Sequence, residues 1–359
     1  MQTKSTLSPR DNLLRTLRRQ GFERVPVDPN SFCPSQREAF VKRFGHDRIH
    51  EYFEMPFRGV WNTMQATYTD PRKLFPRETL PEHTHIDVFG VGHSVHSPEC
   101  FHMTQMHHPL KGDITESEVE HYPFPVIHTT QEALTAKTDD IHSKGFAALG
   151  GMSCTIWETS WYMRSMEDLM VDMLTDAPQA TLLFDRVMEM SCQMARTYAC
   201  AGADILLTGD DIGMQSTPMM DPDLWRKWIK PRFAKVLRAA REIKPDILVF
   251  YHSCGFVIPF IEDLIEIGVD ILQPVQPECM DFADVYKLFG GRISFWGTIG
   301  TQQVLPFGTP DEVRAVVKRN LDICGPQGGI VIGPTHMVEP EVPWENLEAM
   351  RLAVKEYRK

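Results

Sequence analysis

Residues 245–268 read PDILVFYHSCGFVIPFIEDLIEIG and give the clearest indication of the fold. Residues 246–251 form an aliphatic and β-branched run of strand length, and residues 256–267 repeat apolar positions with the period of a helix. Between them lies HSCG, in which His252 and Cys254 are one residue apart. The stretch therefore predicts a buried strand, a short polar loop and a helix, which together make one βα unit.

The same order of strand, loop and helix recurs along the chain. Strands are expected at 203–208, 269–274, 292–297 and 329–333, with weaker ones upstream at 145–151, 85–91 and 24–28. Helices are expected at 222–242, 281–289 and 310–324, and a last one begins at Pro343. Eight parallel strands in succession predict an α/β protein with a closed (β/α)₈ TIM barrel.

The region from about 29 to 140 is too long for two ordinary βα units. We therefore expect it to carry extra helices and loops over the barrel mouth, in an elaborated N-terminal region. No linker, repeat or low-complexity tract interrupts the chain, so residues 1–359 are expected to form a single barrel domain.

Composition narrows the class of function. The 359 residues are 42% hydrophobic and 24% charged, with a formal net charge of −11 and no long charged blocks, which argues against a nucleic-acid partner. No apolar run reaches the roughly 18–20 residues that a membrane span needs, and the N-terminal residues lack the features of a secretory signal. The eight cysteines are scattered without disulfide-type spacing. These features predict a cytoplasmic protein that acts on a small molecule or binds a protein partner.

Polar residues gather where the expected strands end. The segments are TGDD at 208–211, HSCG at 252–255, QPVQPE at 273–278, GTIGTQ at 297–302 and GPTH at 333–336. In a TIM barrel the chemistry collects at the carboxyl ends of the strands, so these segments should meet at one mouth. The candidates there are Asp210, Asp211, His252, Cys254, Gln276, Glu278 and His336.

His252 and Cys254 should point the same way, because alternate residues of a strand share a face. An imidazole and a thiolate in reach of one ion suit zinc, which in catalytic sites keeps an open position beside three protein ligands. We expect His336 to be the third ligand, and Asp210 or Asp211 could add a carboxylate. Alternatively, His252 bonds a carbonyl and Cys254 is an inert buried thiol. Cys324, at the apolar end of a helix, is expected in the core.

Three blocks of the sequence resemble the uroporphyrinogen decarboxylase superfamily, which also contains zinc- and corrinoid-dependent methyltransferases. These blocks are DLWRKWIKPRF at 223–233, residues 252–299, and residues 308–350. The resemblance implies a barrel enzyme of the methyltransferase branch, with Zn²⁺ and with a corrinoid (cobalamin) supplied by a partner carrier protein. Decarboxylases of this superfamily carry substrate-binding arginines in an N-terminal segment, and the matching residues 24–36 here, RVPVDPNSFCPSQ, lack them.

Two further departures refine what the resemblance implies. Methyltransferases that pass a methyl group to a thiol carry His-x-Cys and a later Cys, and that later position falls here on His336. Related sequences more usually show an Asp where this chain has Gly300. Replacing a thiolate by imidazole leaves more positive charge on zinc and makes it a better Lewis acid for a departing oxygen.

This reasoning predicts a zinc-dependent methyltransferase, an O-demethylase component, that moves a methyl group from an O-methylated donor to the Co(I) corrinoid of a carrier protein. A methoxyaromatic donor is favoured because phenolate leaves readily. Glu158, Asp210 and Asp211 could protonate or orient the leaving oxygen. Candidates for the pocket wall are Trp157, Met214, Trp296 and Gln276, with Met152, Trp161 and Tyr162 beside them. The alternatives are a decarboxylase, methyl transfer from a methyl-corrinoid protein to a thiol, and a barrel that binds without turnover.

Overall fold

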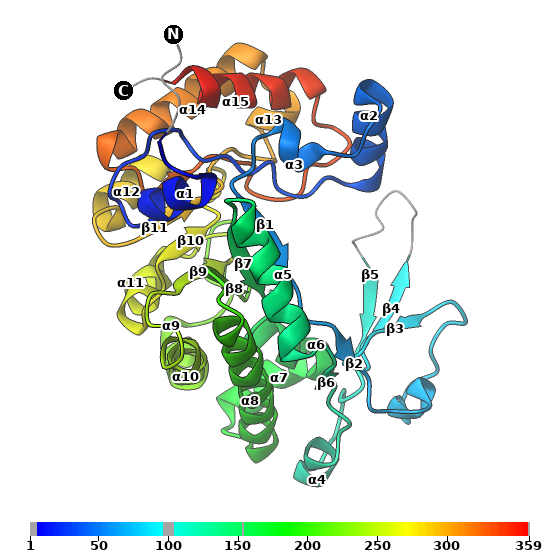
Figure 1. The fold of residues 1–359 in the computed structure, drawn as a ribbon. Coiled ribbons are helices and arrows are strands. Elements are labelled where there is room, and N and C mark those ends of the chain that lie inside the picture. Colours follow the sequence, from blue (N-terminus) through cyan, green and yellow to red (C-terminus); the bar gives the residue numbers. More distant parts are fainter. Residues whose placement is uncertain (1–5, 96–103, 153, 358–359) are drawn as a thin grey trace.

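A parallel β-sheet organises the molecule (Figure 1). The computed structural model describes residues 6–95, 104–152 and 154–357. Within these residues the sheet has seven parallel strands in the order β1-β7-β8-β9-β10-β11-β12. The strands are β1 (Phe57–Val60), β7 (Ala147–Gly151), β8 (Ile205–Gly209), β9 (Leu248–His252), β10 (Ile271–Gln273), β11 (Ser294–Trp296) and β12 (Ile330–Val331). Six of them are the strands expected from 145 onward, with bounds that differ from the expected ones by at most two residues.

The sheet curls around its own apolar core. The ring of Phe57 on β1 lies 5.0 Å from that of Trp296 on β11, and these strands are not neighbours in the sheet. Phe250 on β9 also contacts Trp296, at 5.3 Å. The contacts therefore cross the interior of a TIM-barrel-like fold, in which inward-facing side chains of all seven strands form one cluster.

The segment expected as the first strand, 24–28, lies beside β12. Val27 forms a parallel bridge with Ile332, and the amide of Asp28 donates to the carbonyl of Ile332 at 2.9 Å. The amide of Ile332 in turn donates to Pro26 at 3.1 Å. The segment thus occupies the eighth strand position through a single bridge.

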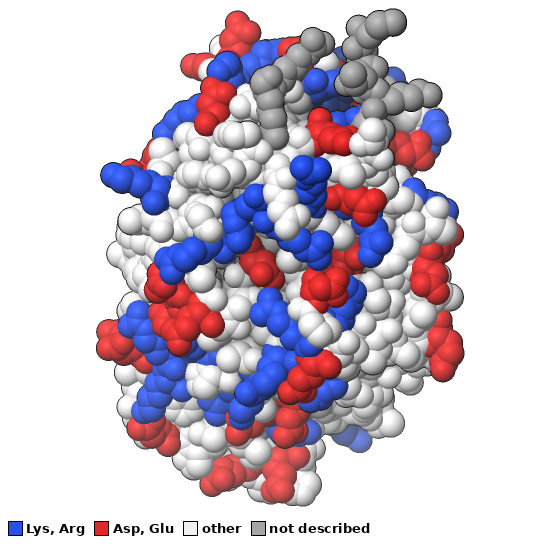
Figure 2. Space-filling model, turned by 60° about the vertical axis from the view of Figure 1, so that its left-hand side comes forward, with Lys and Arg blue, Asp and Glu red and all other residues white. Residues whose placement is uncertain are grey.

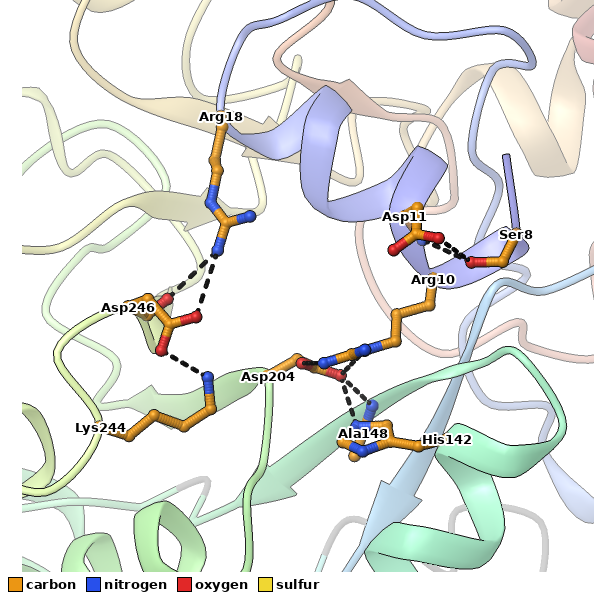
Figure 3. Close-up of polar contacts among 9 residues, drawn as sticks. All are labelled: Ser8, Arg10, Asp11, Arg18, His142, Ala148, Asp204, Lys244 and Asp246. Atoms are coloured by element: carbon orange, nitrogen blue, oxygen red, sulfur yellow. Dashed lines mark hydrogen bonds and ion pairs between the residues drawn. The ribbon is translucent and has the colours of Figure 1, made fainter. Parts of the chain in front are cut away.

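Helix α1 (Pro9–Leu17) closes the amino-terminal end of the barrel, since Leu13, Leu14 and Leu17 pack into the interior cluster. Figure 3 shows how its polar face is held. Arg10 donates to both carboxylate oxygens of Asp204, at 2.9 and 2.7 Å. The same carboxylate bonds the ring of His142 at 2.8 Å and the amide of Ala148 at 3.0 Å.

Burial disfavours the charge on Asp204, but its hydrogen bonds from Arg10 and from the Ala148 amide outweigh that cost. The pKa of Asp204 is therefore lower than its ordinary value. The ionised carboxylate, which stands just before β8, therefore binds both α1 and the helix that precedes β7.

Outer helices cover the sheet, and the layer between holds the larger apolar cluster. They are α5 (Gln131–Ser143), α6 (Trp157–Arg164), α7 (Met166–Leu174), α8 (Pro178–Cys200), α9 (Pro222–Trp228), α10 (Lys230–Arg241), α11 (Ile258–Ile267), α12 (Phe282–Phe289), α13 (Val304–Phe307), α14 (Pro310–Cys324) and α15 (Trp344–Glu356). The single helix expected at 222–242 is divided at Ile229, because Pro231 has no amide hydrogen to continue the first helix. Cys324 is buried in this layer, as expected.

The expectation of a barrel strand at 85–91 is wrong. His85–Ile86 is β3 of a separate antiparallel sheet with β4 (Gly92–Val95) and β5 (Thr104–His107). The chain turns between β3 and β4, where the Asp87 carboxylate accepts from the amides of Phe89 and Val91, at 2.9 and 3.0 Å. The barrel strand is β1 instead, whose sequence FRGV contains an Arg and a Gly and gives little strand signal.

The remaining elements before α5 form the elaborated region. They are α2 (Pro34–Phe44), α3 (Ile49–Tyr52), β2 (Met64–Gln65), the 3₁₀ helix η1 (Pro71–Leu74), α4 (Glu116–Glu120) and β6 (Val126–Ile127). The chain after β5 is bound to α6, since His108 contacts the carbonyl of Tyr162 at 2.8 Å and Leu110 donates to Met163 at 2.9 Å. Because α6 follows the carboxyl end of β7, the chain after β5 lies beside the barrel mouth.

The surface carries charges of both signs. Figure 2 shows Lys and Arg interspersed with Asp and Glu over one face of the molecule. Neighbouring outer helices are joined by such pairs, as in Lys230 of α10 with Asp263 of α11 at 2.7 Å. Among the described residues, none of the helices has the length and apolar character that crossing a membrane requires.

Candidate metal centre

The candidate site lies at the carboxyl ends of two adjacent strands. Strand β9 ends at His252, which is paired in register with Gly209 at the end of β8. The residues that follow these positions, Asp211 after β8 and Cys254 after β9, therefore emerge side by side. This is the juxtaposition that a parallel sheet produces at its carboxyl edge.

Asp211, His252 and Cys254 bring one oxygen, one nitrogen and one sulfur together within 4.8 Å of one another. The Nε2 of His252 lies 3.6 Å from an Asp211 carboxylate oxygen and 3.8 Å from the Cys254 sulfur. Ligands at zinc bond lengths of about 2.0–2.3 Å in a tetrahedron stand roughly 3.3–3.7 Å apart. The three donor atoms are thus of the kind that zinc binds, and the two separations from His252 are close to those of a tetrahedral site.

Gln273, at the end of β10, orients the His252 ring. Its Nε2 donates to the carbonyl of Thr335 at 3.2 Å, so its Oε1 is directed to Nδ1 of His252. A hydrogen on Nδ1 leaves the lone pair of Nε2 facing Asp211 and Cys254. This is the supporting bond that metal-binding histidines usually have, and it involves a residue that the sequence analysis did not single out.

Glycines allow the loops of the site to approach closely. A Cβ at Gly209 would lie 2.6 Å from the His252 carbonyl oxygen, and one at Gly213 would lie 2.7 Å from that of Cys254. The Cys254 amide donates to Asp211 at 2.8 Å, and the Gly255 amide donates to Gln276 at 3.1 Å. The two ligand loops therefore hold each other in place.

The site is partly enclosed and electronegative. The side chains of His252 and Asp211 are 25% and 37% exposed. Burial, followed by the nearby Asp211 carboxylate, raises the pKa of the Cys254 thiol. A bound cation would offset both effects, because it favours the thiolate and neutralises the carboxylate.

His336 lies at the rim of the same site. Its ring is exposed, and its centroid is 6.4 Å from that of His252. In the structure the third group beside His252 and Cys254 is Asp211, which the sequence analysis had named as a possible added carboxylate. The part of His336 as a ligand stays a prediction.

Glu158 faces the site from the first turn of α6. Its side chain is nearly buried, and Tyr162 donates to its Oε1 at 2.7 Å. Burial, with the adjacent Asp211 carboxylate as the next cause, raises the pKa of Glu158. A carboxyl group therefore lies beside the metal residues, and its part as an acid stays a prediction.

Asp210 points away from the metal residues. It is fully buried, and its carboxylate accepts from the amides of Thr155, Ile156 and Glu158 at 3.2, 3.0 and 2.9 Å. Asp210 therefore holds the start of α6, which belongs to the preceding βα unit. Its contacts support a positioning role, and its part as an acid toward a leaving oxygen stays a prediction.

The predicted pocket residues are spread over different layers. Trp157 is fully buried between sheet and helices, and Trp296 lies in the barrel interior with its Nε1 donating to Asp28 at 2.8 Å. Gln276 is buried and accepts a hydrogen bond from the Gly255 amide, whereas Met214 is 55% exposed beside the ligand loops. Of the four, Met214 is the one open to a ligand. Met152 is buried, and Trp161 and Tyr162 are half-buried on α6.

The loop at Gly300 meets a carboxylate from the neighbouring unit. A Cβ at Gly300 would lie 2.3 Å from Oε1 of Glu278, which accepts from the amide of Gln302 at 3.2 Å. Glu278 therefore brings a carboxylate to the turn at Gly300.

Comparison with solved structures identifies similar folds. A methyltransferase from Methanosarcina mazei superposes with a TM-score of 0.68 at 18% identity, over 98% of this chain and 99% of the other. A D-psicose 3-epimerase from Clostridium cellulolyticum reaches 0.42 at 9% identity, over 67% and 85% of the two chains. An endo-β-1,4-xylanase from Gloeophyllum trabeum reaches 0.40 at 11% identity, over 63% and 81%. The first of these matches shows the same fold along nearly the whole of both chains.

Comparison with sequences gives the family. A search of curated proteins finds no significant match. The family model described as uroporphyrinogen decarboxylase (URO-D) matches residues 84–357, which include β7 to β12 and all of the candidate metal residues. The chain therefore belongs to the uroporphyrinogen decarboxylase family.

Proposed function

We propose that this protein is a zinc-dependent methyltransferase that moves a methyl group from a methoxyaromatic donor to the Co(I) corrinoid of a carrier protein. The observation that carries the proposal is the cluster of Asp211, His252 and Cys254 at the mouth of a URO-D-family barrel. A relative of the same fold is described as a methyltransferase, which supports this branch of the family over decarboxylation.

The donor set favours zinc in a Lewis-acid role. His252, Cys254 and Asp211 would hold it, and His336 is the further ligand predicted from the sequence. Zinc held by one sulfur with nitrogen and oxygen keeps substantial positive charge, and when bound it would polarise an ether oxygen.

The chain's own residues supply the remaining requirements for methyl transfer. When the bond between methyl carbon and oxygen breaks, both electrons stay on the oxygen, and the acceptor provides the electron pair of the new bond. Glu158, half a turn into α6 and bonded by Tyr162, would donate a hydrogen bond or a proton to that oxygen. Asp210 fixes this end of α6 and so sets the position of Glu158.

Metal content of the purified protein tests the centre. We expect about one zinc per chain, with loss in His252→Ala and Cys254→Ser and a smaller content in Asp211→Asn. His336→Ala decides whether that residue is a ligand. Matched controls are His83→Ala and Cys200→Ser, because both side chains are exposed away from the cluster.

Methyl transfer is tested separately with a reduced corrinoid protein and methoxyarenes, by following the conversion of the Co(I) spectrum to that of methyl-Co(III). Glu158→Gln should retain zinc and lower the rate by about 100-fold, the usual contribution of a positioned acid. Zinc that survives loss of both His252 and Cys254 would contradict the metal centre. Transfer to a thiol, with no demethylation of any methoxyarene, would contradict the proposed direction.

A further inference from the structure

Trp61 follows β1 and fills a space made by two glycines. Phe57 and Gly59 share the inward face of β1, and Leu149 and Gly151 share that of β7. A Cβ on Gly151 would lie 1.9 Å from Cζ3 of Trp61, and one on Gly59 would lie 2.4 Å from its Nε1. The indole ring therefore lies on the backbone of both strands, inside the rim of the barrel.

The ring is at the same mouth as the metal residues. Gly151 pairs in register with Leu207 on β8, and two residues further along β8 Gly209 pairs with His252. Strand β7 is two strands from β9, a lateral distance of roughly 10 Å at ordinary strand spacing. A ligand of the size of one aryl ring can span that distance.

Trp61 is open on the side that does not face the glycines. Its side chain is 48% exposed, although its ring rests on backbone. Met214, beside the ligand loops, is another exposed large apolar residue, at 55%. Exposed apolar groups next to a polar cluster are typical of ligand sites.

The backbone next to Trp61 is fixed. The hydroxyl of Tyr198 accepts from the Asn62 amide at 2.9 Å and donates to the Gly151 carbonyl at 2.8 Å. The Asn62 side chain also donates to Thr197 at 2.9 Å. One tyrosine thus ties the chain beside Trp61 to the strand on which its ring rests, which makes the ring a rigid surface before any ligand arrives.

We propose that Trp61 is the stacking platform for the aromatic ring of the methyl donor, and that it selects aromatic over aliphatic methyl ethers. The inference rests on the proposed function for the identity of the donor. Trp61 offers a flat π-face on the inside of the mouth, and offset stacking on such a face favours planar rings over flexible chains of similar size.

Direct binding of guaiacol, a methoxyphenol, to the purified zinc-loaded protein tests this by equilibrium dialysis. Trp61→Ala should weaken guaiacol binding by about tenfold or more, and Trp61→Phe by about threefold. Methoxyethanol, which has no ring, should bind all three proteins equally. Zinc content should not change, because Trp61 is not in the metal cluster.

A second variant, which displaces the Trp61 indole sterically, tests whether the position of this ring is important. Gly151→Ala keeps Trp61 but displaces its indole, and we expect the same loss of guaiacol binding. The double variant Trp61→Ala with Gly151→Ala should bind no more weakly than Trp61→Ala alone. Gly291→Ala is the control, since nothing lies within 4 Å of a Cβ placed there.

The outcomes separate this inference from the proposed function. Unchanged guaiacol binding by Trp61→Ala, or no binding by the unmodified protein, would overturn the platform even if methyl transfer from another donor is observed. Binding that depends on Trp61 in a protein that transfers no methyl group would support the platform and overturn the proposed reaction.

Discussion

Three residues, Asp211, His252 and Cys254, make the candidate metal site, and each stands at or just after the end of a strong aliphatic strand. Their meeting could therefore be predicted from strand ends alone. Trp61 could not, because the strand before it contains Arg58 and Gly59 and carries little apolar signal. The place of its ring depends on Gly151, ninety residues away in the chain.

Gln273 gives a prediction at this scale. Replacement by Met keeps the length of the side chain but removes the acceptor for Nδ1 of His252. We expect zinc affinity to fall about 10- to 100-fold, since the ring loses the bond that sets its orientation. Competition with a chromophoric chelator measures this, and Gln215→Met, an exposed glutamine, serves as control. Equal affinities for the two variants would show that the orientation of His252 is fixed by other contacts.

At the scale of elements, helix α6 depends on a carboxylate from another unit. The amides at the start of α6 bond to Asp210, which stands at the end of β8. Sequence shows a helix cap only when the capping residue directly precedes the helix, so this contact could not be read from the chain. The sequence analysis named both Asp210 and Asp211 as candidates for the site. In the structure Asp211 lies with the metal residues, whereas Asp210 bonds to the start of α6.

Asp210→Ala should lower the free energy of unfolding by about 2–4 kcal/mol, because several buried amides lose their acceptor. Asp221→Ala, which removes an exposed cap of α9, should cost about 1 kcal/mol. Urea denaturation of both variants measures the difference. If the two losses are equal, the buried cap has no special part in holding α6.

At the scale of the whole molecule, the barrel is closed below by α1 and Asp204 (Figure 3). The regular units after residue 203 were predicted with nearly correct bounds, since each has its own aliphatic strand and amphipathic helix. The sequence analysis did not predict that α1 closes the amino-terminal end of the barrel, and it did not predict the antiparallel sheet. Both are defined by contacts between distant segments and leave no periodic pattern.

Asp204→Asn should lower the free energy of unfolding by about 3 kcal/mol at neutral pH, because a buried charge pair with Arg10 is broken. The pKa of Asp204 is lower in the folded protein than its ordinary value, so its stabilisation is present above about pH 4 and is lost as the pH falls further. The difference between the two proteins should therefore shrink below pH 4.

Denaturation at several pH values measures this effect. Asp246→Asn is the control, since Asp246 is largely exposed and pairs with Lys244 at 2.6 Å, a contact expected to contribute less than about 1 kcal/mol. A deficit for Asp204→Asn that stays constant as the solution is acidified would contradict an ionised Asp204 in the native protein.

The pairing of residues 24–28 with β12 also bears on how the protein is made. The amide of Gly21 donates to Gln327 at 2.8 Å, and Val27 bridges Ile332, so the barrel is completed by contacts about three hundred residues apart in the chain. During translation the early segment is exposed long before its partner strand leaves the ribosome. The barrel can therefore close only after residues 327–332 have been synthesised, and such high contact order makes that step slow.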